Sequence, residues 1–352
     1  MIGLMKISPG DTQLELREVE LRDPAAGEVV IRVRYAGICG TDIHIRDDHF
    51  QSYPPVILGH EYTGTVERLG DGVDATLLGA RVVVEPHAAA CHVCFLCRGG
   101  NPEICASKRS PGWGIHGAFA SHVVVPAWLI HRVPDHLADE VAVLAEPMAV
   151  TVTALRRGHL AAGDVVLIVG PGPVGLLAAL AARASAAAEV VVVGRTDGAR
   201  LETARQLGFA TTTADQAGTF MRARTNGRGA DLVLEATGTE AGVAAAFDGV
   251  RRRGRITAVG LSGTPSISVR WDFATTRDAD LAFAMSSSYE AWEPALTILG
   301  LVAEQAATLP TFFALTDWAT AFQAVEERTV VKAVIDPTIQ QVTRDGQLGS
   351  AA

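Results

Sequence analysis

The sequence lacks the features that would direct a protein to nucleic acid, to secretion or to a membrane. It has no evident basic stripe, and 39 acidic against 30 basic residues give a net charge of −9, so no nucleic-acid surface is expected. The start, MIGLMKISPG, has no charged leader followed by a long apolar run, unlike a signal peptide. The most apolar stretch, 174–193, is interrupted by Arg183 and Glu189, which predicts a helix and a strand and not a membrane span. The cytoplasm is the expected location.

Cysteine is also scarce, and the five cysteines are unevenly distributed. Four have the spacing C-x2-C-x2-C-x7-C, at Cys91, Cys94, Cys97 and Cys105. A reducing compartment favours metal binding over disulfides, and four thiolates complete a tetrahedral zinc with no position left for substrate. Bacterial ferredoxins use C-x2-C-x2-C-x3-C-P for iron–sulfur clusters, but here the last gap is seven residues and alanine follows the last cysteine. The cluster therefore predicts a structural zinc site.

The fifth cysteine, Cys39, lies far upstream in the segment CGTDIH. A catalytic zinc needs about three protein ligands and an open position. Candidate partners for Cys39 are His60 and Glu61, in the segment GHE, and Glu146. The sequence thus predicts two zinc ions per chain, one structural and one catalytic.

The residue pattern changes near position 150. At 352 residues the chain exceeds one ordinary core, so two domains are expected. Before 150, short β-rich segments are separated by glycine and proline, and 31–35 alternates apolar and polar residues as a half-buried strand does. After Asp164 the order becomes strand, glycine turn, helix, strand, which is typical of a parallel α/β sheet. This alternation fades beyond about 285, where the chain is expected to return to the first domain.

A glycine-rich loop, Gly170-Pro171-Gly172-Pro173-Val174-Gly175, follows a predicted buried strand and opens a predicted helix over 174–188. The first glycine permits a tight turn, the second lets a pyrophosphate approach the backbone, and the third lets the helix pack closely on the strand. Free N–H groups at the helix start can then bind phosphate oxygens. In this context the loop predicts dinucleotide binding.

The end of the second strand of this unit indicates which dinucleotide. NAD-binding proteins place Asp or Glu about 20 residues beyond the loop, on the ribose hydroxyls. Here that position is Gly194, followed by Arg195 and Thr196, with Arg200 one turn further on. A guanidinium can donate a charge-assisted hydrogen bond to a 2′-phosphate, so NADP is preferred. The alternative is that both arginines are only solvated and that the site accepts NAD as well.

These motifs together resemble the zinc-containing medium-chain dehydrogenase/reductase (alcohol dehydrogenase) family, in particular its sorbitol and threonine dehydrogenase branch. The resemblance extends from Gly27 to Val334. It implies an α/β protein with a GroES-like β-rich catalytic domain over 1–150 and 286–352, which includes a structural zinc lobe at about 88–108. A Rossmann domain, a doubly wound parallel sheet, is implied over 151–285, with the active site in the cleft between the domains. The family is usually dimeric or tetrameric.

The resemblance also assigns roles to single residues. Cys39 and His60 match the first two ligands of the catalytic zinc. Glu61 and Glu146 compete for the third position; either could bind the metal while the other holds the metal-bound water, and they could exchange. Thr41 matches the family's hydroxyl proton relay, and His44 matches its histidine relay towards solvent. A turn-capping hydroxyl and a surface histidine are the alternatives for these two residues.

The implied reaction is hydride transfer between a secondary alcohol, polyol or cyclitol and NADP. An L-threonine 3-dehydrogenase-like enzyme and an NADPH-dependent ketone reductase are alternatives, and a zinc-stabilised NADP-binding sensor is the non-enzymatic one. Six further residues either line the cleft or belong to ordinary packing: His49, Phe50, Trp113, His116, Phe119 and Trp292.

Overall fold

A computed structural model describes residues 1–10 and 12–338 of the chain. It divides into two compact units: Met1–Glu146 with the described residues from Leu309 to 338 form unit 1, and Pro147–Thr308 form unit 2. The sequence predicted divisions near 150 and 285. Residues 286–308, expected in the first domain, belong to unit 2, where helix α10 (Trp292–Leu301) contacts helix α5 (Pro173–Ala184).

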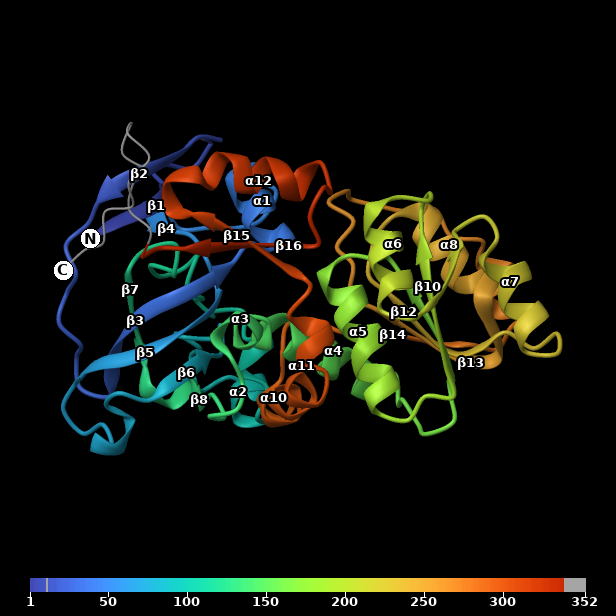
Figure 1. The fold of residues 1–352 in the computed structure, drawn as a ribbon, viewed down its shortest axis with the longest axis horizontal. Helices are drawn as coiled ribbons and strands as arrows, with labels where there is room; N and C mark the ends of the chain where they lie inside the picture. Colours follow the sequence, from blue (N-terminus) through green and yellow to red (C-terminus); the bar gives the residue numbers. More distant parts are fainter. Residues whose placement is uncertain (11, 339–352) are drawn as a thin grey trace. The chain divides into compact units, whose positions relative to one another are not determined.

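The main sheet of unit 1 has seven strands in the order β15-β16-β3-β5-β6-β8, with β7 paired to β3. Their bounds are β3 Glu28–Gly37, β5 Glu61–Leu69, β6 Arg81–Val84, β7 His122–Pro126, β8 Ile130–Arg132, β15 Pro310–Ala314 and β16 Lys332–Asp336. In β3 the predicted alternation is observed, because Ile31 and Val33 are buried while Arg32 is exposed. The last strand, β16, pairs with β3 through Val334 and Gly37, so the end of the described chain returns to the first unit (Figure 1).

A second, three-stranded sheet of unit 1 has the order β2-β1-β4 and is antiparallel. Its strands are β1 Ile2–Lys6, β2 Leu14–Glu18 and β4 Val56–Ile57. The helices of unit 1 are α1 Gly40–Arg46, α2 Phe95–Arg98, α3 Asp139–Ala142 and α12 Trp318–Glu326, with 3₁₀ turns at Ala75–Leu77, Pro102–Ile104, Ala127–Leu129 and Leu315–Asp317. Short helices between strands agree with the β-rich pattern that the sequence shows before residue 150.

Unit 2 is built on a six-stranded parallel sheet in the order β11-β10-β9-β12-β13-β14. Its strands are β9 Val165–Val169, β10 Glu189–Gly194, β11 Ala210–Thr213, β12 Ala230–Glu235, β13 Val250–Ala258 and β14 Asp280–Phe283. Numbered within the unit this is 3-2-1-4-5-6, the order of a doubly wound dinucleotide-binding sheet. The predicted α/β fold, a GroES-like β domain with a Rossmann-type sheet, is confirmed.

Helices alternate with the strands of unit 2. They are α5 Pro173–Ala184, α6 Ala199–Gln206, α7 Ala217–Arg224, α8 Glu240–Gly249, α9 Trp271–Thr275, α10 Trp292–Leu301 and α11 Ala303–Ala306, with a 3₁₀ turn at Tyr289–Ala291. Helix α4, Ala145–Arg157, begins at the end of unit 1 and continues in unit 2. Helix α5 ends at Ala184 and not at 188 as predicted, because Ala186 has a φ of 63° and the Ala187 N–H donates to the Ala182 carbonyl, which closes the helix.

Within residues 1–10 and 12–338, the structure contains no helix that is both long and apolar enough to cross a membrane.

Candidate metal centres and nucleotide loop

The four clustered cysteines meet at one point in unit 1. The Sγ–Sγ distances are 3.9 Å for Cys91–Cys97, 4.0 Å for Cys94–Cys105 and 3.6 Å for Cys91–Cys105. These sulfurs are too far apart for disulfides, whose S–S bond is about 2.05 Å. A tetrahedral zinc with Zn–S bonds of about 2.3 Å would hold its sulfurs about 3.8 Å apart. The cluster therefore fits the donor set and spacing of a four-thiolate zinc site.

Local backbone structure prepares these thiols for a cation. The Cys94 N–H points to Cys91 Sγ at 3.4 Å, and the Cys97 N–H to Cys94 Sγ at 3.5 Å, at the start of helix α2. Backbone N–H groups of Val93 and Cys94 lower the pKa of Cys91 to about 6. Burial and the neighbouring thiols raise the pKa of Cys97 to about 12. A bound cation would stabilise all four thiolates together.

The second candidate centre contains Cys39, His60 and Glu61, whose ligand atoms all lie within 4.8 Å of one another. Cys39 precedes helix α1, and its N–H donates to Asp42 Oδ2 at 2.8 Å, which fixes the turn into the helix. His60 and Glu61 stand at the start of β5, where Glu61 pairs across the sheet with Gly37 of β3. The helix start and the strand start thus place the three side chains together.

The electrostatics of this centre favour a cation. His60 is buried, and its Nδ1 lies 3.6 Å from Asp42 Oδ1, although neither atom has a hydrogen bond. Burial opposes a charge on His60, but Asp42 and Cys39 raise its pKa well above the usual value. Glu146 is buried too, and burial together with the charge of Glu61 raises its pKa to about 7. A metal ion would replace the proton that each of these groups otherwise retains, so the residues present fit a zinc site.

Two residues of this centre were missed by the sequence analysis. Asp42 connects Cys39 to His60, as described above. Lys332, in β16, is 1% exposed, forms an ion pair with Glu61 Oε2, and donates from Nζ to the Ile38 carbonyl at 2.9 Å. Burial would lower the pKa of Lys332, but the charges of Glu61 and Cys39 raise it. Asp42 lies within the CGTDIH segment and could have been inferred from it; nothing local marks Lys332, which lies 271 residues after Glu61.

Thr41 and His44 lie on α1. Thr41 Oγ1 is 3.5 Å from Cys39 Sγ, so the hydroxyl belongs to this centre. His44, in the last turn of α1, is half-buried, and its ring centroid lies 6.2 Å from that of the exposed His49. The predicted relay residues therefore share one helix, with the Thr41 hydroxyl beside Cys39 and the His44 imidazole one turn further along.

The six residues considered for a cleft lining separate into different environments. Phe119 is fully buried in the core of unit 1 and packs edge-on against Phe322 at 6.3 Å, and Trp292 is fully buried in unit 2. Phe50 and Trp113 form an edge-on pair at 5.7 Å. Packing therefore accounts for Phe119 and Trp292.

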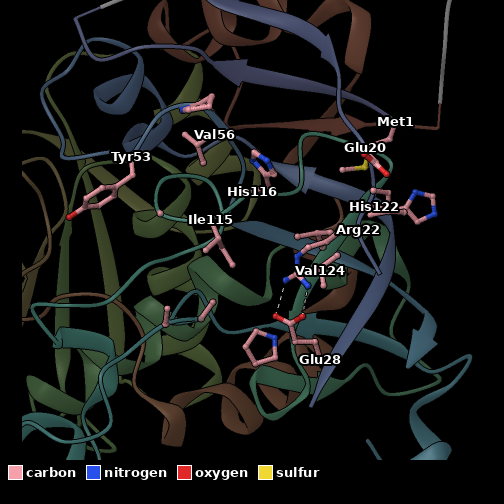
Figure 2. A pocket seen from close by; sticks show the side chains of 17 residues that line it. Met1, Glu20, Arg22, Glu28, Tyr53, Val56, Ile115, His116, His122 and Val124 are labelled. Atoms are coloured by element: carbon pink, nitrogen blue, oxygen red, sulfur yellow. Dashed lines mark hydrogen bonds and ion pairs between the residues drawn. The ribbon is translucent and has the colours of Figure 1, made fainter. Parts of the chain in front are cut away.

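His116 lines a cavity of about 510 Å³ in unit 1, whose lining includes neither Cys39, His60, Glu61 nor Glu146. Its Nδ1 accepts a hydrogen bond from the Ile57 N–H at 3.2 Å. Figure 2 shows its ring above the Arg22–Glu28 ion pair. Burial and the charge of Arg22 lower the pKa of His116. This cavity is separate from the candidate metal centre.

The glycine loop of unit 2 has the geometry that the sequence predicted. Gly170 has a φ of 110°, and Gly172 precedes α5 with Pro173 as the first helical residue. A Cβ on Gly175 would come within 1.8 Å of the Gly170 carbonyl oxygen, so only glycine permits this close packing. The N–H groups at the start of α5 are available to bind a phosphate.

At the end of β10 the predicted cofactor residues are also visible. Gly194 is the last, buried residue of the strand, and Arg195 and Thr196 follow it as exposed residues. Arg200 lies in the first turn of α6. The sequence analysis overlooked Asp197, but its carboxylate forms a 2.6 Å ion pair with Arg205. Asp197 is therefore paired with a cation, while Arg195 is exposed at the end of the strand.

Comparison with known proteins agrees with both units. The family model of the alcohol dehydrogenase GroES-like domain matches residues 25–135, and that of the zinc-binding dehydrogenase matches residues 173–300. The chain is 30% identical to a sorbitol dehydrogenase of Halalkalibacterium halodurans over 341 residues, 96% of this chain and 99% of that one. It is 36% identical to an L-threonine 3-dehydrogenase of Pyrococcus horikoshii over 268 residues, 74% of this chain and 76% of that one.

Among solved structures, the alcohol dehydrogenase TADH from Thermus sp. ATN1 is similar, with a TM-score of 0.86, 28% identity, and 96% of this chain and 99% of that one covered. Two family models, a full-length relative and a full-length structure thus agree with the motifs and with both observed units. The chain belongs to the zinc-containing medium-chain alcohol dehydrogenase family.

Proposed function

We propose that the protein is a zinc-dependent oxidoreductase that transfers a hydride between a secondary alcohol or polyol and NADP. The observation that carries this proposal is the convergence of Cys39, His60 and Glu61 in unit 1, together with the buried Glu146, whose pKa responds to the charges of Glu61 and His60. A protein that only bound a nucleotide would need the glycine loop of unit 2 but none of these groups. These groups therefore favour an enzyme over the zinc-stabilised NADP-binding sensor.

Cys39, His60 and Glu146 are the proposed ligands of the catalytic zinc, and the four clustered cysteines those of the structural one. Glu61 is already neutralised by Lys332, which makes it a weaker donor than Glu146. His60 Nδ1 faces Asp42, so Nε2 is the atom left for the metal. A bound zinc would act as a Lewis acid that lowers the pKa of a substrate hydroxyl.

The residues of α1 have the proton-handling roles. The Thr41 hydroxyl, beside Cys39, is placed to accept the substrate's hydroxyl proton and to pass it on. His44, half-buried on the same helix, delivers it to solvent, because an imidazole ring can accept a proton on one nitrogen and release one from the other. Glu61, paired with Lys332, is proposed to orient hydrogen-bond donors at the metal, such as a bound water.

Binding of NADP is proposed at Gly170, Gly172, Pro173, Val174 and Gly175 for the pyrophosphate, with Gly194, Arg195, Thr196 and Arg200 at the adenosine ribose. The exposed position of Arg195 beyond β10 supports a contact with a 2′-phosphate. In Arg195→Glu, kcat/KM for NADP should fall by roughly 10- to 100-fold while that for NAD holds or rises, since a charge-assisted hydrogen bond contributes about 1.5–3 kcal/mol. Equal loss with both cofactors would contradict the assignment.

The proposed substrate class follows the relatives, whose names include sorbitol and threonine dehydrogenases. The decisive test is a panel assay at 340 nm on zinc-replete protein. Polyols, cyclitols, diols and L-threonine would be offered with NAD and NADP, and the matching ketones with NADH and NADPH. Turnover of a polyol or related secondary alcohol with NADP supports the proposal. Turnover of L-threonine, or of ketones alone, would favour the corresponding alternative, and tight NADPH binding with no turnover of any substrate would favour the sensor.

A further inference from the structure

Lysine is rare in this chain and occurs at unusual places. There are 3 lysines, Lys6, Lys108 and Lys332, against 27 arginines, and all three lie in unit 1. Lys6 is 0% exposed and Lys332 is 1% exposed. Fully buried ammonium groups are uncommon because each must find hydrogen-bond acceptors to replace water. The acceptors that each buried ammonium contacts therefore indicate which segments of the chain it joins.

Lys6 lies at the end of β1 and bonds to the last turn of α1. Its Nζ donates to the Ile45 carbonyl at 2.9 Å and to the Arg46 carbonyl at 2.9 Å. The same atom forms a 2.7 Å ion pair with Asp48 Oδ1. Three acceptors match the three N–H bonds of an ammonium group. Lys6 thus bonds to carbonyls at the C-terminal end of α1, where a helix lacks its own N–H donors, and it shares the Ile45 carbonyl with the Asp48 N–H at 3.3 Å.

The remainder of this helix end is tied down by backbone bonds. The Asp47 N–H donates to the Ile43 carbonyl at 3.0 Å, and the His49 and Phe50 N–H groups donate to the His44 carbonyl at 2.8 and 3.1 Å. Asp48 has a φ of 56°, and its Oδ2 accepts from the Gly10 N–H. The Lys6–Asp48 pair therefore joins β1 and the turn that follows it to the end of α1.

The two ends of this segment are held in the same way. Before α1, Lys332 donates to the Ile38 carbonyl, next to Cys39, and after it Lys6 donates to the Arg46 carbonyl. We propose that Lys6 is a positioning residue for the proton relay: it fixes the C-terminal end of α1, so that His44 stays in register with Thr41 and Cys39. This inference rests on the proposed function in assigning the relay to α1, whereas the anchoring itself does not depend on any reaction.

The first test measures the anchoring without substrate. Lys6→Met keeps the length of the side chain and removes the ammonium, and Leu4→Ala is the matched control, because Leu4 lies in the same strand and is fully buried but bonds to no carbonyl of α1 through its side chain. Hydrogen exchange at the amides of Asp47, His49 and Phe50 should accelerate at least tenfold in Lys6→Met. Leu4→Ala should leave these amides near the wild-type rate even if it lowers the Tm more.

The second test measures turnover and its rescue. In Lys6→Met, kcat should fall at least tenfold with little change in KM and with two zinc ions retained, because a displaced relay loses part of the roughly 10²–10⁴-fold that positioned proton transfer supplies. Added imidazole buffer, which bypasses a displaced relay, should restore most of the lost rate. Leu4→Ala, assayed below its Tm, should show neither the loss nor the rescue.

Lys6→Arg keeps the positive charge and provides a second variant in case Lys6→Met does not fold. Its planar fork cannot direct three donors as an ammonium does, so the same changes are expected with smaller size. Wild-type exchange at these amides in folded Lys6→Met or Lys6→Arg overturns the proposal, as does a Leu4→Ala variant that reproduces both effects. If wild-type protein turns over no substrate, the proposed function fails, and the exchange measurement alone still decides the anchoring.

Discussion

The two candidate metal centres of unit 1 use thiolate sulfur in opposite ways. In the lobe, four thiols from a short stretch of chain are linked by Sγ–Sγ distances of 3.6, 3.9 and 4.0 Å, which suits a tetrahedral zinc. At Cys39 a single thiol meets a histidine, two buried glutamates and the buried Lys332, drawn from four separate parts of the sequence. The first set consists of four identical ligands, whereas the second combines sulfur, nitrogen and oxygen ligands and contains two carboxylates that compete for one coordination position. A zinc ion with four protein ligands stabilises the fold, whereas a zinc ion with three protein ligands keeps one coordination position open for substrate.

The largest contrast is expected between cysteine variants of the two centres. Cys39→Ala should lower kcat by more than about 10³-fold, since Lewis-acid stabilisation is worth several kcal/mol, and should leave the Tm within a few degrees. Cys94→Ala should lower the Tm sharply and cause aggregation, because a structural zinc contributes folding free energy directly. Each variant should retain one zinc ion. Thermal scans, turnover assays and metal analysis on the same samples test this contrast. A Cys94→Ala variant that stayed folded but lost activity would contradict it.

Lys332 provides a sharper contrast, because it touches only the open centre. In Lys332→Met, Glu61 loses its cation and can turn to the metal, so zinc should be held about tenfold more tightly against a chelator while kcat falls by at least tenfold. A purely structural role would predict the opposite change in zinc retention. Adding Glu61→Gln to this variant removes the competing carboxylate and should bring zinc retention back towards the wild-type value.

Lys108 is expected to give the smallest effect. It follows Cys105 by three residues, donates to the Glu103 carbonyl at 2.6 Å, and its charge acts on Glu146. Burial lowers the pKa of Lys108 to about 8. Lys108→Met should change kcat by only a few-fold and leave the Tm nearly unchanged, because one partly screened charge on a ligand is a small perturbation. A large drop in Tm would instead show that Lys108 stabilises the cysteine lobe.

Sequence patterns predicted the parts of the molecule that depend on short-range order. The cysteine spacing predicted the lobe, since ligands close in sequence are close in space. The glycine loop predicted the turn at Gly170, because only glycine tolerates its φ and the approach at Gly175. The buried strand 165–169 was predicted by its continuous apolar run.

Long-range pairings could not be predicted in this way. The Glu61–Lys332 and Lys6–Asp48 ion pairs depend on how distant strands and helices meet. The return of 286–308 to unit 2 and not unit 1 was missed because helix α10 carries no signal for its partner. For Phe119 and Trp292 the sequence left cleft lining and ordinary packing open; both are fully buried, and only the packing around an aromatic side chain separates the two roles.

The measurement that tests the division between the two centres most directly is stepwise zinc removal, with metal content, Tm and turnover followed on one sample. The account predicts that loss of the first zinc ion abolishes turnover with little change in Tm, and that adding zinc back restores it. Loss of the second should unfold unit 1. Full turnover in protein that has lost the zinc ion of the Cys39 centre would contradict the account, because that centre would then not be the one that performs the reaction.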